Sequence, residues 1–357
     1  MFRKSAILLI IIFISFFFVP HHAFSLTDEE KNHIEVYGKA AKSVVNITST
    51  VLSYDFFRRV LPREGSGTGI IIDKKGHILT NLHVIKNASS IEVTLHDKSR
   101  FRGKLVGVYK EYDLAVIRID APSKVLKPLP IGSSRNLMVG QKVLAIGNPF
   151  GLGSTLTTGI ISSLGRSIKS GKGHMMDELI QTDASINPGN SGGPLLDSDG
   201  RLIGINTAII SPSGGSVGIG FAVPVDIAKR VVPDIIKQGY VSLPWLGVTV
   251  FPLFPSLSEY LGIKVNHGVL IIEMVQNGPA HRSGLKGPVK RVRIGNAILP
   301  IGGDVVVAVD GKKIKTTEEF MKAYRRKRPG DKIRMKILRR NSFYLVPVKL
   351  GEMPIRR

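Results

Sequence analysis

The sequence predicts a mostly β protein in two units: an antiparallel barrel or sandwich, then a smaller unit that mixes strands with helix. Short apolar runs recur from residue 44 onward, often about 8–12 residues apart, with clusters of Gly, Asn, Asp, Ser and Pro between many of them. This spacing favours antiparallel strands over βαβ units. The chain has 357 residues, of which 43% are hydrophobic and 22% charged. These values exclude a disordered or collagen-like chain, and the length predicts two or three domains at about 100–200 residues each.

Residues 1–25 have the pattern of an export signal. Arg3 and Lys4 precede an apolar run at residues 6–19, and residues 23–25 (Ala-Phe-Ser) offer the small side chains that a signal peptidase reads. The run is shorter than the roughly 20 apolar residues of a membrane span, but a retained membrane anchor stays open as the alternative. Both interpretations place the chain outside the cytoplasm, in the periplasm or cell envelope.

The first unit is predicted to cover residues 26–240. It opens with a short helix within 27–42. Its clearest strand predictions are residues 69–73, 77–80, 91–95, 114–119, 142–146 and 201–205. Residues 225–239 carry apolar side chains at helical spacing and end at Gly239. We therefore expect a closing helix, which Pro233 either kinks or delays.

The second unit is predicted at residues 245–350, after a linker and before a tail at 351–357. Its strands are expected at residues 268–272, 304–309, 332–337 and 344–348. One clear helix begins at Thr316, where Thr316 and Glu319 form a capping box in which each side chain satisfies the other residue's N–H group. The basic segment 286–301 is expected to be a hairpin.

Composition excludes several kinds of chemistry. The chain has no cysteine, so disulfides, thiol nucleophiles and cysteine-based metal sites are excluded, and we expect no metal or cofactor. The net charge is +23, and residues 245–357 hold 22 basic and 8 acidic residues. Such a balance favours anionic partners, but a solvated basic surface is the simpler interpretation, because the basic residues are spread along several segments. Nucleic-acid binding is not expected because no aromatic stripe accompanies the basic residues, whereas association with a membrane surface stays open.

The strongest local pattern is Gly-Asn-Ser-Gly-Gly-Pro at residues 189–194. Glycines on both sides of a serine permit a sharp turn and let a substrate carbonyl approach the main chain closely. Gly189, Asn190 and Ser191 form a candidate oxyanion hole, with the N–H groups of Gly189 and Ser191 as donors. The alternative is a plain turn between two strands, which does not require this whole pattern.

A serine nucleophile needs a base, and His83 is the best candidate among nine histidines. It lies where a strand gives way to a turn, whereas His77 begins a strand and is interpreted as a surface side chain. Asp113, at the start of an apolar strand, is the candidate carboxylate that orients His83. Taken singly, His83 could be structural and Asp113 a turn cap. The order His83, Asp113, Ser191 matches the chymotrypsin arrangement rather than that of subtilisin or the α/β-hydrolases.

Residues 44–230 resemble the trypsin-like domain of the HtrA/Deg family of exported serine proteases. The matching stretches are residues 65–73, 79–84, 112–117, 145–152, 180–187, 189–193, 202–208 and 218–224. The resemblance implies a chymotrypsin-like double six-stranded β-barrel, with the catalytic triad in the cleft between the barrels. It also implies a homotrimer and cleavage of misfolded or stress-marked proteins.

The resemblance also assigns substrate-binding positions. Ser185, six residues before the nucleophile, corresponds to the floor of the primary specificity pocket, so no carboxylate is present there to bind Lys or Arg. The pocket walls are expected to include Ile186, Thr207, Ala208 and Ile209. Small or medium aliphatic side chains should fit such a pocket, which discriminates weakly. Broad cleavage of unfolded chains follows.

The second unit resembles a single, small α+β PDZ module, as in the sensor-type members of the family. The resemblance implies that this module binds the C-terminus of a peptide as an added strand. The implied binding residues are Trp245, Leu246, Gly247, Val248, Val250, Phe320 and Tyr324. Ordinary core packing is the alternative for the last two. Activation by a PDZ ligand is a further expectation, and the runner-up function is a chaperone or peptide-binding scaffold with a silent or conditionally active protease domain.

Overall fold

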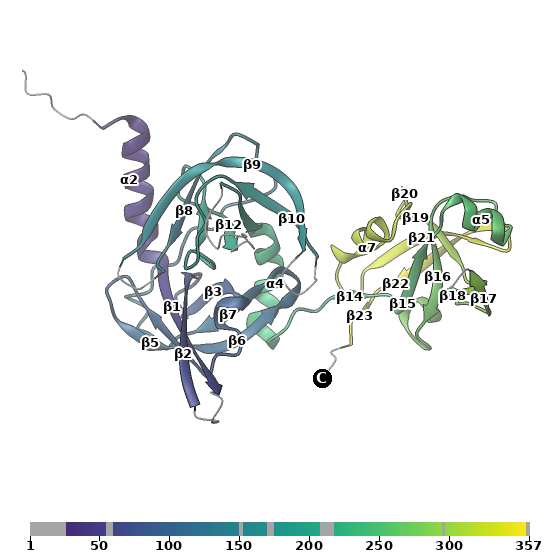
Figure 1. The fold of residues 1–357 in the computed structure, drawn as a ribbon, viewed down its shortest axis with the longest axis horizontal. Helices are drawn as coiled ribbons and strands as arrows, with labels where there is room; N and C mark the ends of the chain where they lie inside the picture. Colours follow the sequence, from purple (N-terminus) through teal and green to yellow (C-terminus); the bar gives the residue numbers. More distant parts are fainter. Residues whose placement is uncertain are drawn as a thin grey trace, which may run out of the picture. The chain divides into compact units, whose positions relative to one another are not determined.

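The structure is a computed structural model that describes residues 26–54, 60–149, 153–169, 175–207, 218–294 and 297–354. The chain divides into two units, one ending at Gly239 and the other beginning at Tyr240 (Figure 1). The predicted export segment at residues 1–25 lies outside the described residues. Among the helices that the structure describes, none combines the length and hydropathy needed to cross a bilayer.

Helix α2 (Asp28–Ala40) opens the first unit and confirms the helix predicted near the N-terminus. Its start is fixed by a complete capping box: Thr27 Oγ1 accepts a hydrogen bond from Glu30 N, and Glu30 Oε2 accepts one from Thr27 N. A short 3₁₀ turn, η1 (Ala41–Ser43), leads from this helix into the first strand.

A seven-stranded antiparallel sheet follows, in the order β5-β4-β1-β2-β3-β7-β6. Its strands are β1 (Val44–Tyr54), β2 (Val60–Ile71), β3 (His77–Asn81), β4 (Ser90–Thr94), β5 (Arg100–Arg102), β6 (Lys104–Tyr109) and β7 (Leu114–Arg118). The resemblance implied six strands here. The seventh arises because Gly103 divides one chain segment into β5, which pairs with β4, and β6, which pairs with β7. The two edge strands are therefore consecutive in the chain, so the sheet must curl until its edges approach each other.

The second half of this unit is a closed six-stranded barrel, as expected, in the order β10-β13-β12-β11-β8-β9. Its strands are β8 (Lys142–Gly147), β9 (Thr155–Lys169), β10 (Met175–Thr182), β11 (Pro194–Leu196), β12 (Leu202–Thr207) and β13 (Gly220–Pro224). Alternate strand residues such as Val143, Ala145 and Ile161 are fully buried inside it. Because the candidate nucleophile segment 189–193 immediately precedes β11, the barrel fixes the position of its C-terminal end.

Helix α4 (Val225–Gln238) closes the first unit and confirms the helix predicted there. Pro233 lies inside the helix and does not delay its start. The helix ends at Gly239, whose φ of 84° is left-handed, a conformation that glycine adopts without strain.

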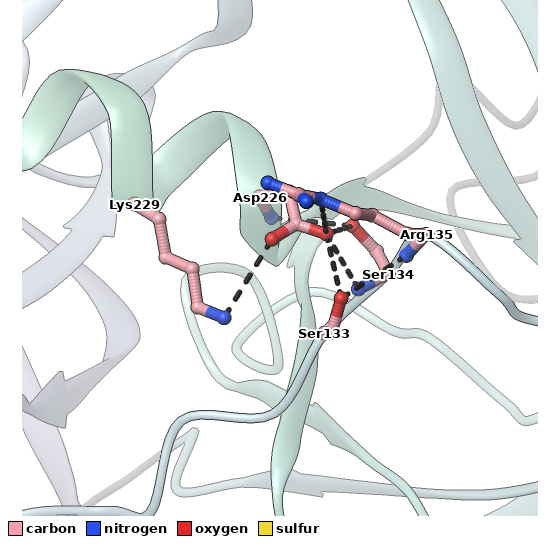
Figure 2. Close-up of polar contacts among 5 residues, drawn as sticks. All are labelled: Ser133, Ser134, Arg135, Asp226 and Lys229. Carbon is pink, nitrogen blue, oxygen red and sulfur yellow. Dashed lines mark hydrogen bonds and ion pairs between the residues drawn. The ribbon is translucent and has the colours of Figure 1, made fainter.

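The N-terminus of α4 is capped from a distant loop, as Figure 2 shows. Ser134 Oγ accepts a hydrogen bond from Asp226 N at 3.2 Å. In return, Asp226 Oδ2 accepts hydrogen bonds from Ser134 N at 2.8 Å and from the Ser133 and Ser134 hydroxyls at 3.0 Å each. Burial opposes ionisation of this carboxyl group, but the hydrogen bonds from Ser134 and Ser133 outweigh burial and hold the pKa of Asp226 below its ordinary value.

We expect Asp226 to stabilise the fold in its ionised form. A carboxyl pKa that is lower in the folded than in the unfolded chain contributes stability above the ordinary pKa of 3.8, and this stability is lost as the pH falls below that value. Asp226→Asn should therefore lower the free energy of unfolding by about 1–3 kcal/mol at pH 7. This deficit in the free energy of unfolding, relative to the unmodified chain, should become smaller toward pH 3. Denaturant unfolding of both proteins at the two pH values checks this, and a deficit independent of pH would contradict it.

The second unit is built on a separate sheet in the order β15-β16-β19-β21-β22, with β20 paired to β19. Its strands are β14 (Pro244–Trp245), β15 (Val248–Pro252), β16 (Val269–Met274), β17 (Lys290–Ile294), β18 (Ala297–Ile301), β19 (Val305–Val309), β20 (Lys312–Lys313), β21 (Lys332–Arg339), β22 (Ser342–Lys349) and β23 (Gly351–Glu352). Its helices are α5 (Pro255–Leu261), α6 (Pro279–Arg282) and α7 (Thr317–Arg325). The four strands predicted in this unit are confirmed. So is the hairpin, which is the β17–β18 pair.

The start of α7 differs in one detail from the predicted capping box. Thr316 Oγ1 accepts a hydrogen bond from Glu319 N, as expected. The Glu319 carboxylate, however, reaches past Thr316 and accepts a hydrogen bond from Lys315 N at 2.7 Å. In the predicted capping box this carboxylate would accept a hydrogen bond from Thr316 N, so the observed contact is shifted by one residue.

Candidate active site

His83 and Asp113 are brought together by the pairing of β3 with β7, which aligns Asn81 with Leu114. His83 lies in the short helix α3 (Leu82–Ile85) directly after β3, and Asp113 precedes β7. Asp113 has a left-handed backbone, with a φ of 53°, a conformation that aspartate tolerates better than most residues. Both residues therefore lie at the same end of adjacent strands.

The Asp113 carboxylate contacts His83 at two points. Oδ1 accepts a hydrogen bond from His83 N at 3.0 Å, and Oδ2 is hydrogen-bonded to Nδ1 of the imidazole ring. The Asp113 carbonyl also accepts from Leu82 N at 2.8 Å. Since Nδ1 is engaged, Nε2 is the ring nitrogen that can face a reacting group. The His83 side chain is 42% exposed, so an incoming substrate can reach it.

His77 does not lie on the surface as the sequence suggested. Its side chain is buried, and its Nδ1 lies 2.6 Å from Asp73 Oδ2. Asp73 Oδ1 also accepts a hydrogen bond from His77 N at 3.1 Å. This pair repeats the two contacts of the His83–Asp113 pair, but within the β2–β3 hairpin. The two histidines differ in access, because the His77 side chain is only 8% exposed.

Ser191 lies in the glycine-rich segment as predicted, and it is almost fully buried. Gly192 has a φ of +83°, and a Cβ at this position would lie 2.2 Å from Thr68 O. Only glycine fits here without a backbone shift. The Ser191 hydroxyl has no hydrogen-bond partner among the described residues. The structure thus joins His83 to Asp113 but does not join Ser191 to His83 by a hydrogen bond, and such bonds are often long in an unliganded enzyme.

The candidate oxyanion segment has one N–H group that is already engaged. Asn190 N donates to Asn187 O at 2.9 Å, and the Asn190 side chain donates to Ser185 O. The N–H groups of Gly189 and Ser191 are therefore the donors that the segment can offer to a substrate oxygen. Gly189 has a φ of +99° and lies against Pro149.

The candidate specificity residues have different environments. Ser185 is exposed, and its carbonyl accepts a hydrogen bond from Thr157 Oγ1 at 3.0 Å. Ile186 is buried in the core of the closed barrel, and Thr207 is buried in β12. Ala208 and Ile209 lie outside the described residues. Of the five, Ser185 alone is both described and exposed.

The candidate peptide-binding residues of the second unit lie around strand β15, which is an edge strand of its sheet. Gly247, next to Trp245, has a φ of +75° just before this strand. Val248 and Val250 are half-buried against the core, whereas Leu246 is fully buried in it. An edge strand offers unpaired backbone groups with which a peptide strand can pair.

Phe320 and Tyr324 lie in the core rather than on the surface of α7. Both are buried in one cluster with Leu246, and their rings meet edge to face with centroids 5.6 Å apart. Burial raises the pKa of the Tyr324 hydroxyl. Two half-buried residues of α7, Met321 and Ala323, pack on the same cluster as Val248 and Val250. Sequence reasoning missed Met321 because the i, i+4 pattern of two aromatics marks the buried face of the helix.

The described residues contain no cluster of three or more His, Asp or Glu side chains that could hold a metal ion.

These features define a trypsin-like serine peptidase with an attached peptide-binding module. Residues 67–205 match the family model for a trypsin-like peptidase domain, and residues 244–350 match that for a PDZ domain.

Relatives and solved structures agree on one family. The chain is 43% identical over 332 residues to chloroplastic protease Do-like 1 of Arabidopsis thaliana, covering 92% of this chain and 74% of the relative. It is 41% identical to a probable periplasmic serine endoprotease, DegP-like, of Chlamydia muridarum, and spans about half (54%) of that relative's length. Among solved structures, it matches the HtrA-type protease AlgW with a decapeptide, at 37% identity and a TM-score of 0.73. That match covers 90% of this chain and 99% of the other. The chain therefore belongs to the HtrA family of Do-like serine endoproteases.

Proposed function

We propose that this chain is an endopeptidase that cleaves unfolded protein through Ser191, His83 and Asp113. The observation that carries the proposal is the double contact of the Asp113 carboxylate with the backbone and the ring of His83. This contact fixes the ring and leaves Nε2 able to accept a proton. Membership of a serine endoprotease family supports the same roles.

In the proposed reaction, Ser191 Oγ attacks the scissile carbonyl carbon and its proton passes to His83 Nε2. The carbonyl oxygen becomes an oxyanion, which accepts hydrogen bonds from Gly189 N and Ser191 N. Collapse of this intermediate breaks the C–N bond as His83 returns the proton to the leaving amine. Water then repeats the sequence on the acyl-enzyme, which releases the acid and restores Ser191.

The proposed substrates are unfolded, misfolded or stress-marked chains with small or medium aliphatic residues at the cleavage position. The exposed Ser185 supports this preference, because a hydroxyl offers no charge to a basic side chain. Purified protein should digest denatured casein, and a fluorophosphonate should label Ser191. A protein that neither digests casein nor reacts with the probe would favour the alternative, a peptide-binding scaffold with a silent protease domain.

We propose that the second unit binds a peptide's C-terminal residues along β15. The half-buried Val248, Val250 and Met321 support an apolar site, and AlgW, with its bound decapeptide, is a relative of similar architecture. A peptide with an apolar C-terminus should then raise the kcat for casein digestion. Equal kcat with the peptide and with its C-terminally amidated form would count against this regulation.

The proposal includes export, through residues 1–25, and a homotrimeric assembly. The periplasmic relatives and the basic–apolar pattern of residues 1–25 support export. N-terminal sequencing of the mature protein distinguishes a cleaved signal from a retained anchor, and light scattering measures the assembly.

A further inference from the structure

We propose that Thr68 is a positioning residue that sets the direction of the oxyanion-hole donors from the neighbouring sheet. This inference rests on the proposed function, because it assigns the donors to Gly189 and Ser191. Thr68 lies in β2 of the first sheet, and its side chain is completely buried. It is separated from the nucleophile by more than a hundred residues of chain and belongs to the other half of the unit.

Thr68 makes four hydrogen bonds, two of them to the nucleophile segment. Thr68 N donates to Ser191 O at 2.9 Å, and Thr68 Oγ1 donates to Gly189 O at 2.5 Å. The same hydroxyl accepts a hydrogen bond from Asn148 N at 2.8 Å. The Thr68 carbonyl accepts one from Thr80 Oγ1 at 2.7 Å. Every hydrogen-bonding group of the residue is therefore used.

These bonds fix the Gly189–Asn190 and Ser191–Gly192 peptide groups, which lie on either side of the Asn190–Ser191 peptide. The Gly189–Asn190 peptide is held at its carbonyl by Thr68 Oγ1 and at its N–H by Asn187 O. The Ser191–Gly192 peptide is held at its carbonyl by Thr68 N and at its N–H by Asn206 O, at 2.8 Å. Because peptide groups are planar, a group held at both ends cannot rotate.

The remaining N–H groups of the segment are directed by the neighbouring peptide groups and, for the Asn190–Ser191 peptide, also by the hydrogen bond from Gly193 N to Asn190 O at 3.0 Å. The N–H groups of Gly189 and Ser191 donate no hydrogen bond to the described residues. Each belongs to a peptide group adjacent to one that Thr68 anchors. Loss of the Thr68 hydroxyl would remove the hydrogen bond to the carbonyl of the Gly189–Asn190 peptide. This peptide could then rotate, and the neighbouring N–H donor would no longer be held in one direction.

Packing shows that the contact is close. A Cβ at Gly193 would lie 3.0 Å from Thr68 Cγ2, just as one at Gly192 would collide with Thr68 O. The two glycines after the nucleophile thus let the segment lie directly on Thr68. Thr80, which binds the Thr68 carbonyl, lies in β3 three residues before His83. The bond from Thr80 is separate from the two bonds that Thr68 makes to the nucleophile segment.

Thr68→Val tests the inference because valine keeps the shape and the backbone N–H but removes the hydroxyl. We expect kcat for a peptide substrate to fall about 10–100-fold with KM changed less than about threefold. This loss is smaller than the 10²–10³ caused by removing an oxyanion donor itself. Affinity for a peptide boronate, which forms a tetrahedral adduct with the serine, should fall by a similar factor. Thr68→Ser should restore most of the kcat and most of the affinity for the boronate.

Thr80→Val is the matched control, since it removes a buried threonine hydroxyl that binds Thr68 but leaves both Thr68 contacts to the nucleophile segment. It should lower the melting temperature and leave kcat within about threefold. Equal kcat losses in the two variants, or an unchanged kcat in Thr68→Val, would overturn the inference. If valine prevents folding, Thr68→Cys, whose thiol is a weak donor, should show the same loss of kcat. Failure of the proposed function is distinct, because the unmodified chain would then be inactive.

Discussion

Ser191→Ala is expected to lower the turnover of denatured casein by about 10⁴–10⁶-fold. Without the hydroxyl no acyl-enzyme can form, and the residual rate comes from binding and oxyanion stabilisation alone. The variant should fold normally, because Ser191 Oγ has no hydrogen-bond partner among the described residues. Its removal therefore leaves no buried group unsatisfied. Initial rates from purified variant and unmodified protein measure the effect.

Ser198→Ala is a suitable control for this experiment. Ser198 is an exposed serine in the turn between β11 and β12 of the same barrel, and its replacement should leave turnover unchanged. Both variants should retain the melting temperature of the unmodified protein. Cleavage by Ser191→Ala at the unmodified rate would reject the nucleophile assignment, whereas loss of activity together with loss of folding would show only a structural role.

The strands and the closing helix could be predicted from local patterns because each repeats a short-range rule. Short apolar runs bounded by turn residues mark strands such as 142–146, and helical spacing that ends at Gly239 marks α4. The division of one edge strand at Gly103 could not be predicted, since it depends on pairing with two different partners, β4 and β7. Likewise, the cap of α4 by Ser134 joins residues 92 positions apart.

The candidate site, too, could be predicted from the sequence only where a local pattern defines it. The glycine pattern around Ser191 predicts the candidate nucleophile segment, because the backbone itself requires glycine there. Sequence gave no reason to connect Thr68 with that segment, since the contact joins two sheets. Nor did it show that His77 has an aspartate partner of its own. What separates His83 from His77 is exposure, 42% against 8%, which only the packed chain determines.

Asp113→Asn is expected to lower kcat by about 10⁴-fold at neutral pH while the fold is kept. The geometry explains why. His83 N is a donor and requires an acceptor at the Oδ1 position, so the carbonyl oxygen of the new asparagine must stay there. Its NH₂ group then faces His83 Nδ1, which must become an acceptor. The ring proton moves to Nε2, and the imidazole can no longer accept the proton of Ser191.

Asp73→Asn provides the matched control, because Asp73 makes the same pair of contacts with His77 that Asp113 makes with His83. Substitution there should force the same change of tautomer on His77. It should cost some stability, yet kcat should stay within about threefold, since the buried His77 lies in a hairpin and takes no part in the proposed reaction. Steady-state kinetics on both variants compare the two sites directly. A kcat for Asp113→Asn above about a tenth of the unmodified value would contradict the orienting role. So would an equal loss in Asp73→Asn, because the effect would then follow from disturbing any His–Asp pair rather than from the tautomer of His83.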